Sequence, residues 1–310
     1  MLRLAHQFDA ATHAWLRERL PGGAVLHRLS ADEPWAVPEG TTVLLVTNGK
    51  LRSLTRTKPS WAKDLAWVHA RPTGVDEAPD WLFDVPHFTV SRGAASFAIA
   101  EYVLAAMLDF EKRLGDVRVT SPESWSGQDI GSLAGRTIGL FGYGEIARTV
   151  AKLARPFGVH VLAVRRQAAA EGDAEFVPLE ELCARSDHMI ICAPLTPATR
   201  GLFDERVFAM CKSGMHLINV ARGALINPMA LRNALDGTIA RATLDVWVEE
   251  PPPAGHWVYG HPRVRLTPHC SSRGPLTEAR LHVILETNLD YWLAGKPKNM
   301  IGKVSRTARY

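Results

Sequence analysis

The stretch from Thr137 to Val164, TIGLFGYGEIARTVAKLARPFGVHVLAV, decides the fold of this 310-residue chain. It begins with a short apolar run, Thr137–Phe141, and turns at Gly142-Tyr143-Gly144-Glu145-Ile146-Ala147. An amphipathic segment then continues to about Phe157, and a second apolar run follows at Val159–Val164. This order predicts a strand, a helix and a parallel strand, which is the repeating unit of an open α/β sheet.

The glycine turn predicts a dinucleotide site. Gly142 allows a tight turn, Gly144 lets the backbone approach a pyrophosphate, and the small Ala147 lets the helix pack closely on the strand. The helix N-terminus offers its free N–H groups and the positive end of its dipole to the phosphates. A purely structural turn is the alternative, because the GxGxxA pattern alone is weak. The strand, helix and second strand in sequence favour the dinucleotide.

The residues at the end of the second strand indicate which dinucleotide binds. Folds that bind NAD usually place an acid there for the ribose 2′-hydroxyl, whereas an arginine accommodates a 2′-phosphate. This sequence has Arg165 and Arg166 at that point. A guanidinium bonds phosphate bidentately and stays charged, so we expect NADP to be preferred and NAD to be possible. Two exposed loop arginines without a ligand are the alternative.

Apolar runs and helical segments alternate along the whole chain. A stripe over Ala94–Arg113 predicts a domain-linking helix, and Pro275–Leu293 predicts a final helix. We therefore predict an α/β protein with two doubly wound parallel-sheet domains, one made of residues 1–93 and 275–310 and the other of residues 94–274. Further strands are expected at Leu2–Gln7, Val43–Thr47, Ala66–His69, Phe88–Val90, His188–Cys192, His216–Asn219, Ala242–Val246 and Val264–Thr267.

Composition excludes several classes of protein. With 46% apolar and 22% charged residues, the chain is neither disordered nor fibrous and is long enough for two domains. The net charge is +4, but five bases without an acid lie in the last fifteen residues, so we expect a solvated tail and no nucleic-acid partner. Four scattered cysteines and no signal or spanning segment predict a cytoplasmic protein without a metal site or membrane contact.

Polar residues follow three of the later strands. The segments are Asn219-Val220-Ala221-Arg222-Gly223, Leu244-Asp245-Val246-Trp247-Val248-Glu249-Glu250-Pro251 and Leu266-Thr267-Pro268-His269. Open α/β sheets bind ligands at the carboxyl ends of their strands, so an arginine, a carboxylate and a histidine should converge. The arginine can hold a 2-oxo acid, and the histidine can move the proton on its ketone oxygen. A surface cap, a solvated acid and a structural histidine are the alternatives.

Together these motifs resemble the D-isomer-specific 2-hydroxyacid dehydrogenases, a family that includes glyoxylate and hydroxypyruvate reductases. The resemblance is strongest from about Leu133 to His269, through GRTIGLFGYGEIA, APLTPATRGLF, INVARGALI, DVWVEEPPP and TPH, and weaker around Gly74-Val75-Asp76. It implies a Rossmann nucleotide-binding domain, a flavodoxin-like substrate domain and an active cleft between them.

The resemblance also implies roles for single residues. Arg222, Glu250 and His269 match the catalytic set, with Glu250 chosen over Glu249 because it directly precedes Pro251. Backbone N–H groups of Thr73 and Gly74, together with Arg222, would bind the substrate carboxylate. Asp245 would bond the nicotinamide amide. The residues expected to contact the cofactor are Gly142, Tyr143, Gly144, Glu145, Ile146, Arg165, Arg166, Pro194, Thr199, Val220, Ala221 and Asp245.

The function implied is the reduction of a small 2-oxo acid, glyoxylate or hydroxypyruvate first, to the D-2-hydroxy acid by NADPH or NADH. The resemblance further implies a homodimer packed through the helix after Ala94. A dinucleotide-sensing, corepressor-like binding protein is the alternative, because such relatives keep Arg222, Glu250 and His269 as well.

Overall fold

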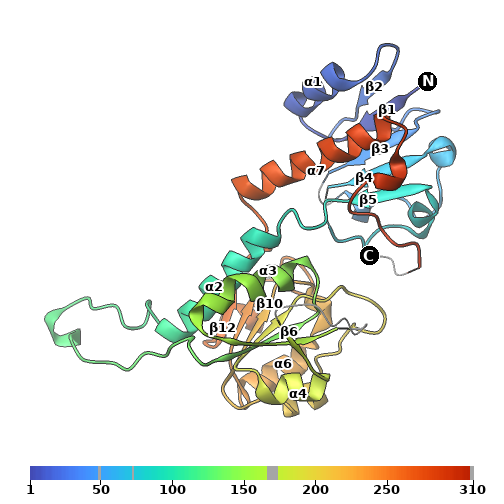
Figure 1. Ribbon diagram of the computed structural model, residues 1–310. Helices are drawn as coiled ribbons and strands as arrows, with labels where there is room; N and C mark the ends of the chain where they lie inside the picture. Colours follow the sequence, from blue (N-terminus) through green and yellow to red (C-terminus); the bar gives the residue numbers. More distant parts are fainter. Residues whose placement is uncertain (48–49, 72, 166–173, 308–310) are drawn as a thin grey trace. The chain divides into compact units, whose positions relative to one another are not determined.

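The chain divides into two compact units, described separately below. A computed structural model describes residues 1–47, 50–71, 73–165 and 174–307. Unit 1 comprises Met1–Ala94 and Glu278–Tyr310, and unit 2 comprises Ala95–Thr277. These borders lie one and three residues beyond those expected from the sequence. In Figure 1, unit 1 carries the blue and red ends of the chain, and unit 2 carries its green-to-orange middle.

Unit 2 is built on a seven-stranded parallel sheet. The order reverses direction between β6 and β9, so the glycine turn after β6 lies at the topological switch point, where such sheets bind ligands. β8 was not predicted, because its two residues are too short to show a strand pattern. Across the sheet, the strands are β12 (Val264–Leu266), β11 (Ile239–Leu244), β10 (Met215–Asn219), β9 (His188–Ile191), β6 (Thr137–Phe141), β7 (His160–Val164) and β8 (Glu175–Phe176).

Helices cover both faces of this sheet (Figure 1). The linking helix α2 (Ser96–Lys112) and α3 (Glu145–Ala154) share one core with strand residues such as Ile218. The neighbouring Leu217 points to the opposite core, which contains residues of the helices on the other face. Both faces are therefore apolar, as parallel strands require. The second group of helices is α4 (Leu179–Arg185), α5 (Glu205–Ala209) and α6 (Pro228–Leu235).

Unit 1 holds a five-stranded parallel sheet with the flavodoxin-like order, as predicted. Helices α1 (Ala10–Arg19) and α7 (Pro275–Leu293) contribute to one core, and short turns of 3₁₀ helix contribute to the other. β2 was not predicted, because it is an edge strand whose side chains are mostly exposed. The order of strands is β2 (Val25–Arg28), β1 (Arg3–His6), β3 (Val43–Val46), β4 (Trp67–Ala70) and β5 (His87–Val90).

The prediction of a solvated C-terminal tail is wrong for residues 302–304, which pair with β5. The N–H of Val90 donates to the carbonyl of Gly302 at 2.8 Å, and the N–H of Val304 donates to the carbonyl of Phe88 at 2.9 Å. A Cβ on Gly302 would lie 1.9 Å from the Val90 oxygen, so this close pairing requires glycine. The tail therefore runs antiparallel along β5 and covers an edge of the sheet. No helix in the described part of the chain has the length and apolarity needed to span a membrane.

Candidate active site

The glycine turn after β6 fits a pyrophosphate. Gly142 has φ +97°, and a Cβ there would lie 2.8 Å from the backbone of Ala193. A Cβ on Gly144 would meet none of the described atoms within 4 Å, so the space beside this residue is open. Helix α3 begins at Glu145 with no side chain capping it at Gly144. Its first N–H groups, including that of Ile146, are therefore oriented to attract an anion.

Two of the expected cofactor residues point their side chains into unit 2 itself. Tyr143 is buried and packs edge-on against Phe176, with ring centroids 5.1 Å apart. Val220 is buried in the same core, beneath α2 and α3. Any contact of these two residues with a cofactor would therefore come mainly from their backbones.

The remaining cofactor positions lie in loops after neighbouring strands. Arg165 directly follows β7 and is exposed, whereas Arg166 lies outside the described residues. Beyond β9, the Thr199 hydroxyl donates to the carbonyl of Pro194 at 2.8 Å and closes a compact loop. These loops follow the carboxyl ends of β7 and β9, on either side of β6.

The end of β10 fixes the backbone around Arg222. The side chain of the buried Asn219 accepts the N–H of Ala221 and donates to the carbonyl of Arg222, both at 3.0 Å. Gly223 packs directly on the segment after β11, because a Cβ there would lie 2.0 Å from the carbonyl carbon of Trp247. The expected substrate arginine thus stands on a loop whose backbone has little freedom.

Glu250 and His269 form a hydrogen-bonded pair. One Glu250 oxygen lies 2.8 Å from Nδ1 of His269, and the other accepts the backbone N–H of Trp247 at 3.0 Å. The two side chains are 35% and 43% exposed. Because Nδ1 is engaged by the carboxylate, Nε2 is the ring nitrogen available to a reacting oxygen.

The charge balance keeps Glu250 ionised. Burial alone would raise the pKa of this carboxyl. The hydrogen bonds from His269 and the Trp247 N–H, with the charges of His269 and Arg222, outweigh burial and hold the Glu250 pKa below its usual value. The side chains expected at the ends of β10, β11 and β12 therefore interact with one another. These strands are also neighbours in the sheet.

Asp245 occupies the centre of the turn that carries His269. Its carboxylate is 1% exposed and accepts the Thr267 hydroxyl at 2.7 Å and the N–H groups of Cys270 and Ser271 at 2.8 and 3.0 Å. The resemblance assigns this acid to the nicotinamide amide. In the structure, groups of the chain itself supply three donors to it.

In unit 1, the expected substrate loop follows β4. The Thr73 hydroxyl donates to the carbonyl of Ser91 at 3.2 Å, and Gly74 is half-buried. The buried His69 lies 2.9 Å from the Thr89 hydroxyl and 3.2 Å from the Ser91 hydroxyl. These bonds tie the end of β4 to the end of β5, so the base of the loop is braced.

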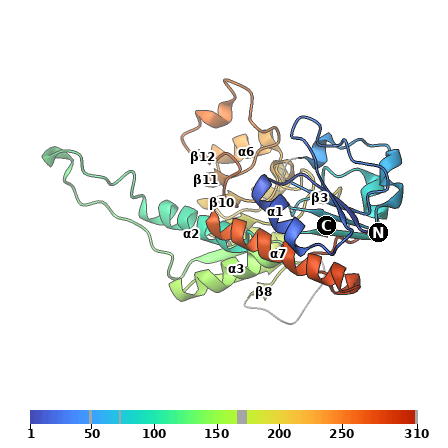
Figure 2. The ribbon, with the colours of Figure 1, turned by 90° about the horizontal axis from the view of Figure 1, so that it is seen from above.

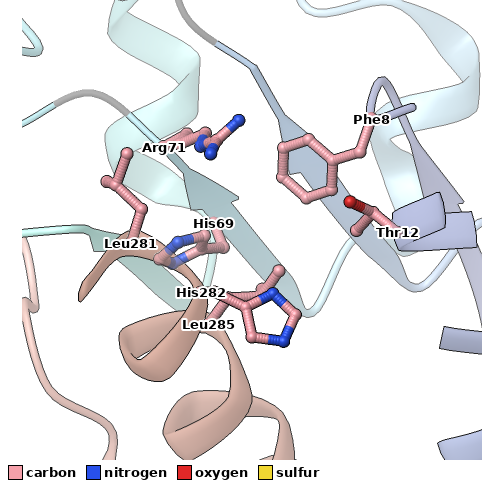
Figure 3. A pocket seen from close by; sticks show the side chains of 7 residues that line it. All are labelled: Phe8, Thr12, His69, Arg71, Leu281, His282 and Leu285. Carbon is pink, nitrogen blue, oxygen red and sulfur yellow. The ribbon is translucent and has the colours of Figure 1, made fainter. Parts of the chain in front are cut away.

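Next to this loop is a small cavity of about 30 Å³, room for one or two water molecules (Figure 3). Arg71 lies along it, paired with Glu278 and 5.9 Å from the ring of Phe8. Because Arg71 and His69 already have partners, the cavity does not offer a ligand site. Its lining residues are Phe8, Thr12, His69, Arg71, Leu281, His282 and Leu285.

The sequence did not single out the groups that hold the site together. Asn219 and Thr267 were expected only as parts of motifs. Tyr102 was expected only as one residue of the helical stripe Ala94–Arg113 and of the weaker family-like segment Ala100-Glu101-Tyr102-Val103. Each is a polar residue at or near a strand end or on a buried helix face, which is a weak signal. Their hydrogen-bond partners are brought close to them only by the fold.

Comparisons with known proteins identify the family that the chain is similar to. Residues 104–271 match the family described as "D-isomer specific 2-hydroxyacid dehydrogenase, NAD binding domain". A curated glyoxylate reductase of Aeropyrum pernix is 35% identical over 177 residues, 55% of this chain and 53% of that protein. A glycerate dehydrogenase of Methylorubrum extorquens is 30% identical over 252 residues, 77% of this chain and 79% of that protein.

Solved structures extend the similarity to both units. A D-isomer specific 2-hydroxyacid dehydrogenase family protein from Aeromonas salmonicida superposes with a TM-score of 0.81 and 27% identity, covering 98% of this chain and 99% of that one. The sequence alignments are shorter, so the chain spans about half the length of curated relatives such as the A. pernix protein. The residues that match the family model, 104–271, all lie in unit 2.

Proposed function

This chain belongs to the D-isomer specific 2-hydroxyacid dehydrogenase family, and from that premise we propose that it reduces a small 2-oxo acid to the D-2-hydroxy acid. Glyoxylate and hydroxypyruvate are the first candidates. The observation that carries the proposal is the pair formed by His269 and Glu250 at 2.8 Å, with the charge of Arg222 acting on the same carboxylate. This set combines a proton donor, its orienting anion and a carboxylate-binding cation.

The chain's own residues account for binding and proton transfer. When bound, the reduced nicotinamide supplies a hydride to C2 of the 2-oxo acid. Arg222 binds the substrate carboxylate and polarises the ketone oxygen. As charge develops on that oxygen, Nε2 of protonated His269 gives it a proton, and Glu250 stabilises the charged ring and fixes its orientation. His269 then regains a proton from water.

The residues that would hold the cofactor fit a dinucleotide. Gly142, Gly144 and the N-terminus of α3 suit the pyrophosphate. We propose that Arg165, with Arg166, favours NADPH by binding the 2′-phosphate, since no acid stands at the end of β7. Replacing both arginines by alanine should weaken NADPH binding about tenfold or more and NADH binding little. Equal weakening of the two cofactors would remove the arginines from this role.

Initial rates of NADPH and NADH oxidation test the reaction directly. The panel is glyoxylate, hydroxypyruvate, pyruvate and bulkier 2-oxo acids. We expect turnover with at least one small acid, faster with NADPH than with NADH. Tight dinucleotide binding without turnover of any acid would overturn the reductase proposal and favour a sensing protein.

The substrate carboxylate would also meet backbone N–H groups of Thr73 and Gly74. We propose this role because the Thr73 side chain is already bonded to Ser91, which leaves the loop backbone as the binding group. The four free thiols suit a reducing compartment, and we propose the cytoplasm.

A homodimer through α2 and the segment 113–132 is the proposed assembly. This segment extends beyond the end of α2 (Figure 2) and exposes 69% of Leu114 and 81% of Trp125. Its base is fastened where Lys112 donates to the carbonyl of Gly131 at 2.8 Å. Sedimentation should give a dimer for the wild type and a weaker dimer for Trp125→Ser. A wild-type monomer at micromolar concentration would contradict this assembly.

A further inference from the structure

His269 stands on a strained turn that needs support from outside its own segment. Its φ is +48°, in the left-handed region, which costs a residue with a side chain about 1–2 kcal/mol. The backbone N–H of His269 donates to the carbonyls of Asp245 and Thr267, each at 2.9 Å. The Asp245 carboxylate binds the next two N–H groups, so one residue after β11 holds three consecutive amides of the turn.

The support continues from Asp245 to helix α2. The hydroxyl of Tyr102 lies 2.7 Å from Oγ1 of Thr267, which lies 2.7 Å from the Asp245 carboxylate. A carboxylate only accepts hydrogen bonds, and a threonine hydroxyl has one proton to give. The proton of Thr267 therefore goes to Asp245, and Tyr102 must be the donor to Thr267.

Tyr102 is suited to be a permanent donor. Burial raises its pKa to about 12, so the hydroxyl keeps its proton throughout the range in which such an enzyme works. Tyr102 also lies on α2, which shares a hydrophobic core with α3 and the sheet of unit 2. A directed chain of hydrogen bonds, in which each bond polarises the next, thus links a packed helix to the turn.

We propose that Tyr102 and Thr267 are positioning residues, which fix the turn that presents His269 by completing the hydrogen bonds of the buried Asp245. The inference rests on the proposed reduction and adds two residues to it. Neither side chain is assigned to substrate or cofactor. Their effect reaches the chemistry through the placement of the His269 ring relative to Glu250 and the reacting oxygen.

Paired substitutions separate positioning from folding. Thr267→Val removes the hydroxyl at nearly constant shape, Thr267→Ser keeps it, and Tyr102→Phe removes only the outer donor. Two matched controls lose a hydroxyl elsewhere. Thr41→Val removes the partly buried bond from the Thr41 hydroxyl to the carbonyl of Pro38 in unit 1, and Tyr291→Phe changes a half-buried tyrosine of α7.

Steady-state kinetics with glyoxylate and NADPH give the first measurement. Thr267→Val should lower kcat about tenfold with the KM for glyoxylate within about twofold, because a misplaced acid slows the chemical step and not substrate binding. Tyr102→Phe should lower kcat less, Thr267→Ser should restore most of it, and both controls should match the wild type. Equal kcat in Thr267→Val and the wild type, or equal losses in Thr267→Val and Thr267→Ser, would overturn the proposal.

Amide hydrogen exchange gives a second measurement that needs no turnover. The N–H groups of Cys270 and Ser271 should exchange about tenfold faster in Thr267→Val than in the wild type, because Asp245 loses the donor that holds it. Unchanged exchange would also overturn the proposal. If the wild type reduces no 2-oxo acid, the proposed reduction fails. Faster amide exchange in Thr267→Val than in the wild type would then still support the role of Thr267 in fixing the turn.

Discussion

Two histidines near the ends of parallel strands differ in what surrounds them. His69 is the penultimate residue of β4 in unit 1 and is 1% exposed, and both of its ring nitrogens lie within hydrogen-bond distance of neutral hydroxyls. His269, after β12 of unit 2, has 43% of its side chain exposed and a carboxylate on Nδ1. Burial lowers the pKa of His69 to about 3, so that ring is neutral and braces the fold. A ring that is open to a ligand and has an anionic partner is suited to proton transfer, whereas a buried neutral ring is not.

The same contrast separates the two sheets. In unit 2, buried polar residues near the strand ends hold the segments that carry Arg222 and His269. Asn219 binds the backbone around Arg222, and Asp245 binds the backbone after His269. In unit 1 the polar residues at the ends of β4 and β5 bond mainly to each other. The chemistry is therefore expected in unit 2, whereas unit 1 supplies a braced loop.

Replacing His269 gives the largest expected effect. His269→Gln removes the proton donor, and general acid catalysis contributes about 10²–10⁴-fold, so kcat should fall by about a thousandfold. NADPH binding, followed by its fluorescence, should stay within about twofold, because the pyrophosphate turn is untouched. A fall of less than tenfold would show that His269 is no more a proton donor than His69.

Replacing His69 should change stability instead of chemistry. His69→Leu removes the ring from the Thr89 and Ser91 hydroxyls, and Thr89 keeps the bond from Trp67 Nε1. We expect this to cost about 2 kcal/mol in the free energy of unfolding at pH 7.5. Urea denaturation measures this difference. If folded His69→Leu lost as much kcat as His269→Gln, the two histidines would not differ in their role in the reaction.

The pH dependence of that stability difference follows from the His69 pKa. The folded-state value, about 3, is below the unfolded value of 6.5, so the wild type has its full stability above pH 6.5 and loses it as the pH falls. By pH 5 this loss is about 2 kcal/mol in the wild type and absent in His69→Leu. The gap between the two proteins should therefore close in acid, and a constant gap would contradict a buried neutral ring.

Gly223→Ala should have the smallest of these effects, confined to unit 2. The new Cβ would displace the backbone of Trp247, whose N–H orients Glu250, and kcat should fall about tenfold. Gly237→Ala is the matched control, because a Cβ there would meet only the Ala234 oxygen, at 3.9 Å. Equal kcat for the two variants would mean that the Trp247 contact does not position Glu250.

The sequence was sufficient where local pattern and strand-end rules apply. The strand, glycine turn and helix at 137–157 were predictable because each has its own periodicity, and the strand ends located Glu250 and His269. The contact of Tyr102 with Thr267 was not predictable, because the two residues are 165 positions apart and only the fold joins them. The pairing of the tail with β5 was missed for the same reason.

In the proposed reaction, Arg222 binds and His269 protonates one and the same 2-oxo acid. A crystal structure with NADP⁺ and oxamate, an unreactive analogue of such an acid, tests it most directly. We predict that the oxamate carboxylate bonds to the Arg222 guanidinium and that its amide oxygen lies about 3 Å from Nε2 of His269. Oxamate bound with its amide oxygen away from His269, or with its carboxylate away from Arg222, would contradict the claim.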